Sequence, residues 1–384
     1  MDLRPTDAAA CAALLGESAR ERRSLRVRGG GTKSYVGELL PTDAVLDTTG
    51  MSGIVDHVPA DLTVTVAGGT RLADVRAALL ERGQILPLDP PHADQATIGG
   101  LVAANSNGFG RLRYGGVRDL LIGTALALAD GTVARAGGRV VKNVAGYDLN
   151  KLVIGSLGTL AVVAEATFKV QPAPPARALA AVRCREHGEA FSVASAIVRT
   201  ALRPSAAVVS GGPDGWTALI GAEGRPAEVE RAMAETARAA AQAGARSERS
   251  DDPEAALGPL RELPATTTDG ALVRAALPLA AQPAFVDIAR RLEVTARVVA
   301  DAGSGIVRVH LRGPDDAVIH GADALLAAAA AVGGSARVER RDATLADRLG
   351  AWAAARPGGD FLMRRIKEAF DPAGILEPGR SIVG

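Results

Sequence analysis

The stretch Arg26–Tyr35, RVRGGGTKSY, places three consecutive glycines before a threonine, a lysine and a serine. Glycine lets successive backbone N–H groups point into one concave turn, and such a group of amides binds phosphate. The lysine can add a positive charge. The stretch therefore predicts a phosphate-binding loop, and its surroundings must decide between a nucleoside triphosphate, a nicotinamide dinucleotide and a flavin dinucleotide.

The loop does not have the spacing of a P-loop. A P-loop places its lysine directly after a glycine, at the start of a helix. Here Thr32 separates Gly31 from Lys33, and Gly37 and Pro41 prevent a long helix from following. The spacing therefore argues against a nucleoside triphosphate site of this kind.

The loop also lacks the helix that a Rossmann dinucleotide site requires. Gly29, Gly31 and Ser34 match the three fingerprint positions, and Asp47 follows at roughly the expected 20 residues. However, a crossover to the next strand takes at least about 10–12 residues with its helix. The same downstream glycine and proline leave no room for that helix, so this site is disfavoured as well. A flexible turn without a ligand is the plain alternative.

Two later segments repeat the composition of the loop on a larger scale. They are Pro87–Gly123, which contains HADQATIGGLVAANSNGFGRLRYGG, and Val140–Val163, VVKNVAGYDLNKLVIGSLGTLAVV. Both collect glycine with small polar residues, so both can expose backbone amides. Three such segments can wrap an extended dinucleotide along its length, which favours a flavin dinucleotide over an empty turn.

With these motifs in order, the chain resembles a known family. Residues 26–174 look like the FAD-binding domain of the vanillyl-alcohol oxidase / p-cresol methylhydroxylase (PCMH-type) superfamily. KNVAGYDLNKLVIGSLGTL is most similar to the FAD-binding E-type subunits of bacterial glycolate oxidases, and the tail DPAGILEPGR matches the ending of that branch. The resemblance covers essentially the full chain and implies that the cofactor is FAD.

The resemblance implies which residues hold FAD, mostly through backbone amides. The residues implied at the pyrophosphate are Gly29, Gly30, Gly31, Thr32, Lys33 and Ser34. Further amides, with the turn before them, come from Asp89, Ala96, Thr97, Ile98, Gly99 and Gly100. The flavin side is closed by Asn105, Ser106, Gly108 and Tyr114. The cradle is completed by Gly155, Ser156, Gly158, Thr159 and Leu160.

The same positions also have purely structural explanations. The glycines could serve hairpin turns, and Tyr114 and Tyr147 could be core aromatics. Members of the superfamily often attach the flavin to a histidine, but the first loop contains none. His57 and His92, the nearest histidines, are interpreted as solvated or core residues. We therefore expect FAD to be bound non-covalently.

The second half of the chain is poor in catalytic side chains. A 2-hydroxy-acid oxidase needs a base, a cation for the carboxylate and an electron acceptor. In the catalytic D-type relatives, the resemblance implies a histidine-rich motif on a strand, often used with a metal. The matching strand here, GIVRVHLRGPDD, keeps only His310, while His187 and His320 are isolated. His310 and Arg380 remain as candidates, and no metal site is expected.

Composition limits the partners, the cysteine chemistry and the location that we expect for this chain. The 384 residues carry a net charge of +1 with both signs interspersed, which does not favour nucleic acid or anionic lipid as a partner. Cys11 and Cys184 can form neither a disulfide framework nor an iron–sulfur site by themselves. The amino terminus has no apolar signal region, and the apolar stretch ADALLAAAAAVGG is too short to span a bilayer. We expect a cytoplasmic protein that reaches the membrane only through a complex.

The pattern of elements predicts an α+β protein with three parts. Leu62–Ala67 alternates as a strand, a helix closed by Gly83 follows, and Asp130-Gly131 predicts a hairpin turn. The proline-rich segment near residue 173 ends the first part. The expected parts are a PCMH-type FAD-binding domain at 1–173, a ferredoxin-like α+β cap domain at 174–340, and a helical tail at 341–384 that returns to the first domain.

The resulting interpretation is a flavin-carrying subunit with reduced catalytic equipment. Leu157 stands where D-type chains have a glutamate, and Ala161 replaces a glycine. The resemblance implies a complex with a D-type flavoprotein subunit and an iron–sulfur subunit, which oxidises glycolate to glyoxylate and passes electrons to a quinone. One alternative is an autonomous FAD-dependent 2-hydroxy-acid or sugar-alcohol dehydrogenase, with Arg312 or Arg380 binding the carboxylate. Another is an assembly subunit without catalysis.

Overall fold

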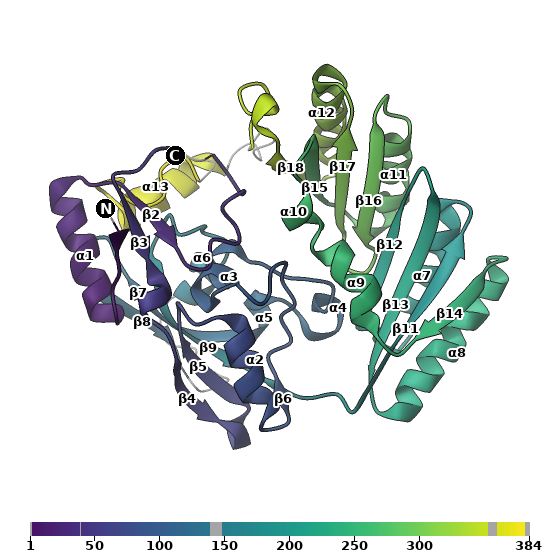
Figure 1. The fold of residues 1–384 in the computed structure, drawn as a ribbon, viewed down its shortest axis with the longest axis horizontal. Helices are drawn as coiled ribbons and strands as arrows, with labels where there is room; N and C mark the ends of the chain where they lie inside the picture. Colours follow the sequence, from purple (N-terminus) through teal and green to yellow (C-terminus); the bar gives the residue numbers. More distant parts are fainter. Residues whose placement is uncertain (1, 39, 139–147, 352–358, 381–384) are drawn as a thin grey trace. The chain divides into compact units, whose positions relative to one another are not determined.

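The computed structural model describes residues 2–38, 40–138, 148–351 and 359–380. The chain forms two compact units (Figure 1). The first unit contains residues 1–108, 115–173 and 356–384, and the second contains residues 109–114 and 174–355. The KNVAGY part of the third glycine-bearing segment, residues 142–147 with Tyr147, lies outside the described residues.

The described strands of the first unit form a parallel sheet, an antiparallel sheet and a short strand pair. The parallel sheet has the order β1-β3-β2, from Asp2–Leu3, Ala44–Asp47 and Leu25–Arg28. The antiparallel sheet has the order β4-β5-β9-β7-β8, from Ile54–Val58, Thr63–Ala67, Val162–Lys169, Leu121–Ala127 and Val133–Gly137. The short pair is β6 and β10, Gln84–Ile85 and Gln171–Pro172. The helices of this unit are α1 (Ala8–Glu21), α2 (Leu72–Leu80), α3 (Ile98–Ala104), α5 (Val117–Leu120), α6 (Leu149–Val153) and α13 (Asp360–Phe370).

Local sequence explains several of these elements. The predicted strand appears as β5, the predicted helix as α2, and the hairpin as β7 and β8. Gly131 has φ +91° in the hairpin turn and Gly83 has φ +65° after α2. Both conformations favour glycine. These local predictions are therefore confirmed.

Strand β9 lies at the centre of the first unit and is buried on both faces. Val163 and Phe168 pack with α2 and α3, whereas Val162 and Ala164 pack with α1 and the parallel sheet. A strand that is covered on both sides is expected to read as a continuous apolar run, as VVAEATF does. This core holds the end of β9 and the segment before it in a fixed place.

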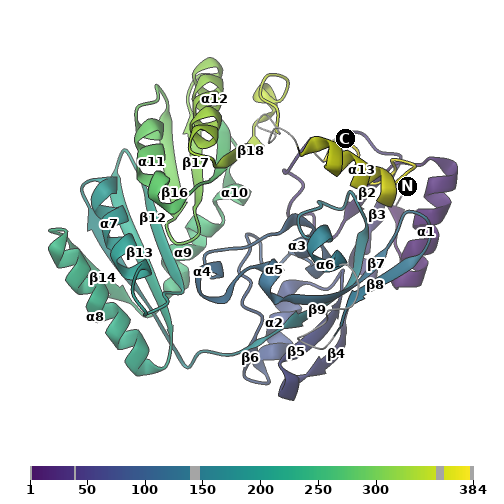
Figure 2. The ribbon, with the colours of Figure 1, turned by 180° about the vertical axis from the view of Figure 1, so that it is seen from behind.

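The second unit is built on an eight-stranded antiparallel sheet. Its strand order is β14-β11-β13-β12-β16-β17-β15-β18, from Arg246–Ser250, Ala176–Cys184, Gly215–Gly224, Ala206–Gly212, Thr295–Asp301, Ile306–Arg312, Ala271–Ala276 and Ser335–Arg341. One face packs against α7 (His187–Val198), α8 (Pro226–Gln242), α11 (Gln282–Arg290) and α12 (Asp315–Ala331), which lie in front of the strands in Figure 2. The other face packs in part against α9 (Pro253–Arg261) and α10 (Leu263–Thr266). The short helix α4 (Arg111–Tyr114) belongs to this unit. The predicted α+β class is confirmed.

Alternation along β17 divides its side chains between the two faces of this sheet. Val307, Val309 and Leu311 belong to the core under the four helices. Since side chains alternate along a strand, Arg308 and His310 lie on the opposite face. The polar residues of the sheet therefore collect on the face that the four helices do not cover.

The carboxyl-terminal segment belongs to the first unit. Leu25 of β2 donates its N–H to Ile375 O at 2.7 Å, and Glu377 donates to Leu25 O at 3.0 Å. The Asp371 carboxylate accepts from the amides of Ile375 and Leu376 at 3.0 and 2.8 Å. DPAGILEPGR is thus held as an extra strand-like segment beside β2. None of the described helices is long and apolar enough to cross a membrane.

Candidate cofactor site

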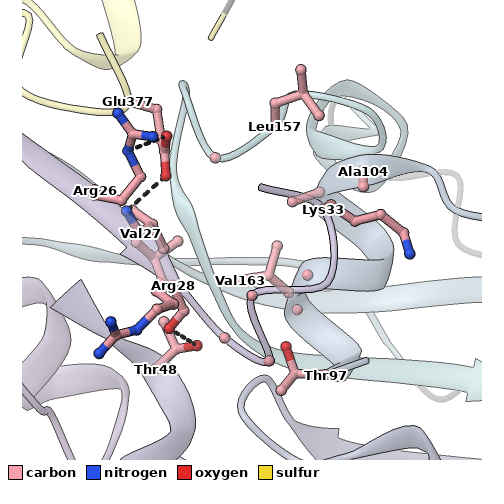
Figure 3. A pocket seen from close by; sticks show the side chains of 18 of the residues that line it. Arg26, Val27, Arg28, Lys33, Thr48, Thr97, Ala104, Leu157, Val163 and Glu377 are labelled. Atoms are coloured by element: carbon pink, nitrogen blue, oxygen red, sulfur yellow. Dashed lines mark hydrogen bonds and ion pairs between the residues drawn. The ribbon is translucent and has the colours of Figure 1, made fainter. Parts of the chain in front are cut away.

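A cavity of about 200 Å³ lies in the first unit where three glycine-bearing segments meet. Its walls come from the loop after β2, the beginning of α3, the segment before β9, and the carboxyl-terminal tail (Figure 3). Sites that enclose a whole small ligand usually measure about 300–1,000 Å³. The cavity is therefore large enough for part of a dinucleotide, such as its phosphates.

The glycine loop after β2 presents free backbone donors to this cavity. Among the described residues, the amides of Gly30, Gly31 and Thr32 donate to no protein acceptor. Gly31 has φ +68°, the left-handed conformation that favours glycine. A Cβ on Gly30 would lie 1.8 Å from the Gln95 carbonyl oxygen. The glycines thus serve both a close loop-to-loop contact and an exposed row of amides, which suits an anion.

Thr97 supplies a second donor at the start of α3. The first amides of this helix are used within the protein, because Ile98 donates to Thr70 O at 2.9 Å and Gly99 to Gly68 O at 2.7 Å. The Thr97 side chain is 2% exposed, lines the cavity and points its hydroxyl towards the glycine loop (Figure 3). Its Oγ1 is buried without a hydrogen-bond partner. Because buried hydroxyls are normally paired, Thr97 indicates a ligand atom at this position.

Charged groups at one end of the cavity leave a positive excess. The Glu377 carboxylate accepts from Val27 N at 2.7 Å and lies 3.2 Å from Arg26 Nε and 3.8 Å from Arg380 Nε. Arg380 also donates to Lys33 O at 3.0 Å. Burial raises the pKa of Glu377 against the lowering effect of the two arginines, and burial lowers the pKa of Arg380. Two guanidinium groups therefore face one carboxylate beside the free amides.

Lys33 was expected to add a positive charge for the phosphate, but its ammonium group already has a partner in the protein. Its ammonium group donates to the Pro91 carbonyl at 2.9 Å. This bond ties the glycine loop to the turn before α3. Lys33 thus helps to shape the loop, and the positive charges nearest to Glu377 come from the two arginines.

Lys367 of α13 connects the tail to the segment before β9. Its ammonium group donates to Thr159 O and Leu376 O, each at 2.9 Å, and to Asp371 Oδ2 at 2.5 Å. A lysine ammonium has three N–H donors, so all three are used. The bond to Thr159 fixes the segment that carries Leu157 and Gly158 into the cavity wall.

The structure brings together about half of the residues predicted to hold the cofactor. Those that line the cavity are Gly29, Gly30, Gly31, Thr32, Lys33, Ser34, Thr97, Gly99, Gly100 and Gly158, with the catalytic candidate Arg380. Those that do not line it are Asp89, Ala96, Ile98, Asn105, Ser106, Gly108, Tyr114, Gly155, Ser156, Thr159 and Leu160. Their roles toward a cofactor stay predictions.

Tyr114 and His310, both expected to have functional roles, belong to the second unit. The Tyr114 hydroxyl donates to Glu223 Oε2 at 2.6 Å, and burial with this bond raises its pKa. A ring nitrogen of His310 lies 2.8 Å from Asp269 O, and Arg312 Nε lies 2.7 Å from Asp269 Oδ2. Each side chain therefore already has a partner within its own unit.

Sequence reasoning missed Arg26, Thr48, Glu377 and Lys367. Glu377 and Lys367 lie in or just before the tail motif, so the motif itself was the available signal. Arg26 lies three positions before Gly29, the first glycine of the loop. Nothing in the sequence indicated Thr48, whose hydroxyl donates to Arg28 O at 3.2 Å across the parallel sheet.

Comparison with known proteins agrees with this geometry. Residues 1–137 match a family described as FAD binding domain, and residues 353–381 match FAD linked oxidases, C-terminal domain. Residues 1–137 of the chain are therefore similar to FAD binding domains. The first match includes the glycine loop and Thr97, and the second includes Lys367 and Glu377. The cavity thus lies where the two matched segments meet.

Two curated proteins that match part of this chain are subunits of glycolate oxidases. The glycolate oxidase subunit GlcE of Escherichia coli (strain K12) is 40% identical over 163 residues, which are 42% of this chain and 46% of that protein. The glycolate oxidase subunit GlcD of Bacillus subtilis (strain 168) is 41% identical over 149 residues, 38% of this chain and 32% of that protein. The chain thus spans less than half of the length of the curated relatives it matches.

A solved structure shows the same fold for both units. The structure of p-cresol methylhydroxylase has a TM-score of 0.74 with 16% identity, over 99% of this chain and 88% of that one. At this identity the similarity concerns the fold alone. The predicted PCMH-type fold is confirmed.

Proposed function

We propose that the first unit binds FAD non-covalently, with the pyrophosphate in the cavity. The amides of the glycine loop, the Thr97 hydroxyl and the guanidinium groups of Arg26 and Arg380 would hold it. The unpaired hydroxyl of Thr97 is the observation that carries this assignment, because a phosphate oxygen would satisfy it. When bound, FAD supplies the electron acceptor for oxidation of an alcohol.

We further propose that the protein is an FAD-dependent oxidoreductase and works as a subunit of a glycolate oxidase. The identity to the glycolate oxidase subunits of two bacteria supports this proposal. In the proposed complex, a D-type flavoprotein subunit and an iron–sulfur subunit take part in oxidising glycolate to glyoxylate and pass the electrons to a quinone. The complex would give the chain a peripheral place at the membrane.

The polar groups of the second unit support dependence on partner subunits. His310 already contacts Asp269, and no group of three His, Cys, Asp or Glu side chains suited to a metal ion occurs in the parts of the chain that the structure describes. His310, the histidine considered as a base, therefore already has a partner in its own unit. This arrangement fits a subunit that carries flavin and contributes little chemistry alone.

The test is purification of the tagged chain alone and after co-expression with a D-type and an iron–sulfur subunit from the same source. The proposal expects a yellow protein in both preparations, and glycolate-dependent reduction of a dye only in the second. Dye reduction by the chain alone would support the autonomous dehydrogenase instead. A folded, colourless chain that gains no flavin band with added FAD would support an assembly subunit.

A further inference from the structure

Glu377 is a buried carboxylate in the wall of the cavity, and the proposed FAD contacts do not include it. Its side chain is 2% exposed and reaches from the carboxyl-terminal tail to β2 (Figure 3). Its backbone has φ +48°, the left-handed conformation that is uncommon for residues other than glycine. Residues held in such conformations cluster at functional sites. A negative carboxylate beside a proposed phosphate site is also the feature of this cavity that opposes binding.

The two oxygens of Glu377 have different surroundings. Oε1 accepts from Val27 N at 2.7 Å. Oε2 lies 3.2 Å from Arg26 Nε and 3.8 Å from Arg380 Nε. Among the described residues, Oε2 and both Nε atoms are buried without a hydrogen-bond partner. Because buried polar atoms are normally hydrogen-bonded, these three atoms indicate a place where a ligand atom binds.

The charge of Glu377 is compensated mainly by Arg26 and Arg380. Lys367 of α13 is the next cation, but its ammonium group pairs with Asp371 Oδ2 at 2.5 Å. Burial raises the pKa of Glu377 above its ordinary value, although Arg380, Arg26 and Lys367 act in the opposite direction. The other charged residues that line the cavity are Arg28 and Lys33. The two arginines thus keep Glu377 ionised against the effect of burial.

An anion that binds the same two arginines changes this balance. The phosphate and the carboxylate then share the two guanidinium groups, and a nearby negative charge favours the protonated form of a carboxyl group. Oε1 must stay an acceptor for Val27 N–H, so the proton binds at Oε2. A carboxyl O–H at Oε2 can donate a hydrogen bond to an oxygen of the ligand.

We propose that Glu377 takes up a proton from solvent at Oε2 when FAD binds, so that the affinity for FAD falls as the pH rises. This inference rests on the proposed FAD site and adds a positioning residue to it. The bound state holds one proton more than the free state, so the affinity changes by about tenfold per pH unit at most. The dependence is confined to pH values above the pKa of Glu377 in the flavin-free chain, because below that pKa both states are protonated.

The experiment titrates the flavin-free full chain with FAD by calorimetry, from about pH 5 to about pH 8, in two buffers of different ionisation enthalpy at each pH. The difference in heat between the buffers gives the number of protons taken up. We expect up to one proton per FAD and an affinity that increases towards acid pH. This measurement needs no variant, so absence of proton uptake at every pH would overturn the proposal even if a variant did not fold.

Glu377→Gln tests whether Glu377 is the group that takes up the proton. Glutamine keeps an acceptor for Val27 N and removes the negative charge, so the variant should bind FAD at least about fivefold tighter at pH 8, without proton uptake. Glu81→Gln, at an exposed position after α2 and outside the cavity lining, should keep the original pH dependence.

Two outcomes separate this inference from the proposed function. If FAD binds with the same proton uptake in Glu377→Gln as in the original chain, the inference is overturned and the FAD site stands. If neither protein binds FAD at any pH, the proposed function fails and this inference fails with it.

Discussion

The two units gather hydrogen-bond donors and positive charge in two different ways. In the first, the donors are mainly backbone amides of the glycine loop, with the Thr97 hydroxyl added. In the second, they are the side chains of Arg274, Arg308 and Arg337, which we call the arginine row and which are held side by side by strand register. Backbone amides carry no net charge, so they do not repel one another, and their positions depend on the backbone conformation. The arginines depend on a carboxylate, Glu339, to be tolerated in the sheet.

This difference determines which substitutions should matter. In the glycine loop the free donors are backbone amides, so adding a side chain to a glycine changes the backbone on which they depend. In the arginine row, the backbone is an ordinary antiparallel ladder and the side chains carry the whole effect. The largest expected effects therefore come from carboxylates that hold each region together, and the smallest from a single methyl group in the glycine loop.

Glu339→Gln should have the largest effect, because it leaves three arginines without their carboxylate. Removing one partner of a buried ion pair typically costs about 3–5 kcal/mol. We expect a loss of that order in the free energy of unfolding, measured by urea denaturation. Glu254→Gln is the matched control, since Glu254 pairs with Arg261 at a 59% exposed position, and should cost less than about 1 kcal/mol. Equal effects for both would show that the row needs no carboxylate.

Lowering the pH should also reduce the free energy of unfolding, because acid protonates Glu339. Burial alone would raise its pKa, but Arg308, Arg337 and Arg274 outweigh burial and lower the pKa from 4.5 to about 2. Because the folded-state pKa is the lower one, the stabilisation is present above about pH 4.5 and is lost as the pH falls towards 2. Between these values, the original chain should lose more stability than Glu339→Gln does. Parallel stability curves for the two proteins would contradict this assignment.

Asp371→Ala should have the next largest effect, in the first unit. The substitution removes the acceptor of two backbone amides and leaves the Lys367 ammonium with carbonyl partners only. We expect a loss of about 2–3 kcal/mol, since hydrogen bonds to charged groups are worth about 1.5–3 kcal/mol. FAD affinity should fall as well, because Asp371 no longer holds Lys367 and the tail in place beside the segment before β9. Asp360→Ala, in the first turn of α13, is the control and should cost less than about 1 kcal/mol.

The glycine loop could be predicted from the sequence and the arginine row could not, for one physical reason. The loop is a local feature, so ten consecutive residues contain its glycines and its hydroxyl groups. The row joins residues 274, 308 and 337, and β15 lies between β17 and β18 in the sheet although it precedes both in the chain. Sequence reasoning selected His310 on the very strand that carries Arg308, because histidine is the more usual catalytic residue.

The same reasoning explains what the sequence missed near the cavity. The tail motif predicted a structural ending, but not that Glu377 would face Arg26 across more than three hundred residues. Register between β2 and the tail sets that contact, through the bridge from Leu25 to Leu376. Contacts that depend on the pairing of distant strands cannot be predicted from any one stretch of sequence.

Thr97→Val tests whether the unpaired hydroxyl meets the cofactor. Losing a hydrogen bond to a charged group costs about 1.5–3 kcal/mol, which is roughly a 10- to 100-fold loss of FAD affinity in a fluorescence titration. Stability of the flavin-free chain should not fall, because Oγ1 has no protein partner. The matched variant Thr48→Val removes a hydroxyl that lines the same cavity but already bonds to Arg28 O. It should lower stability by about 1 kcal/mol and change FAD affinity much less.

Gly31→Ala should have the smallest effect and separates backbone conformation from crowding. A side chain on Gly30 would overlap the Gln95 carbonyl, so substitution there disturbs packing whether or not a phosphate binds. Gly31 has open space around its Cβ position and φ +68°, so alanine adds only the cost of a left-handed conformation, about 1 kcal/mol. Gly83→Ala carries the same cost at φ +65°, also in open space and outside the residues that line the cavity. Both variants should lose similar stability, and Gly31→Ala alone should lose FAD affinity, about fivefold by titration. If Gly83→Ala lowered FAD affinity equally, the loss would reflect general destabilisation, and the amides of the glycine loop would not be the phosphate ligands.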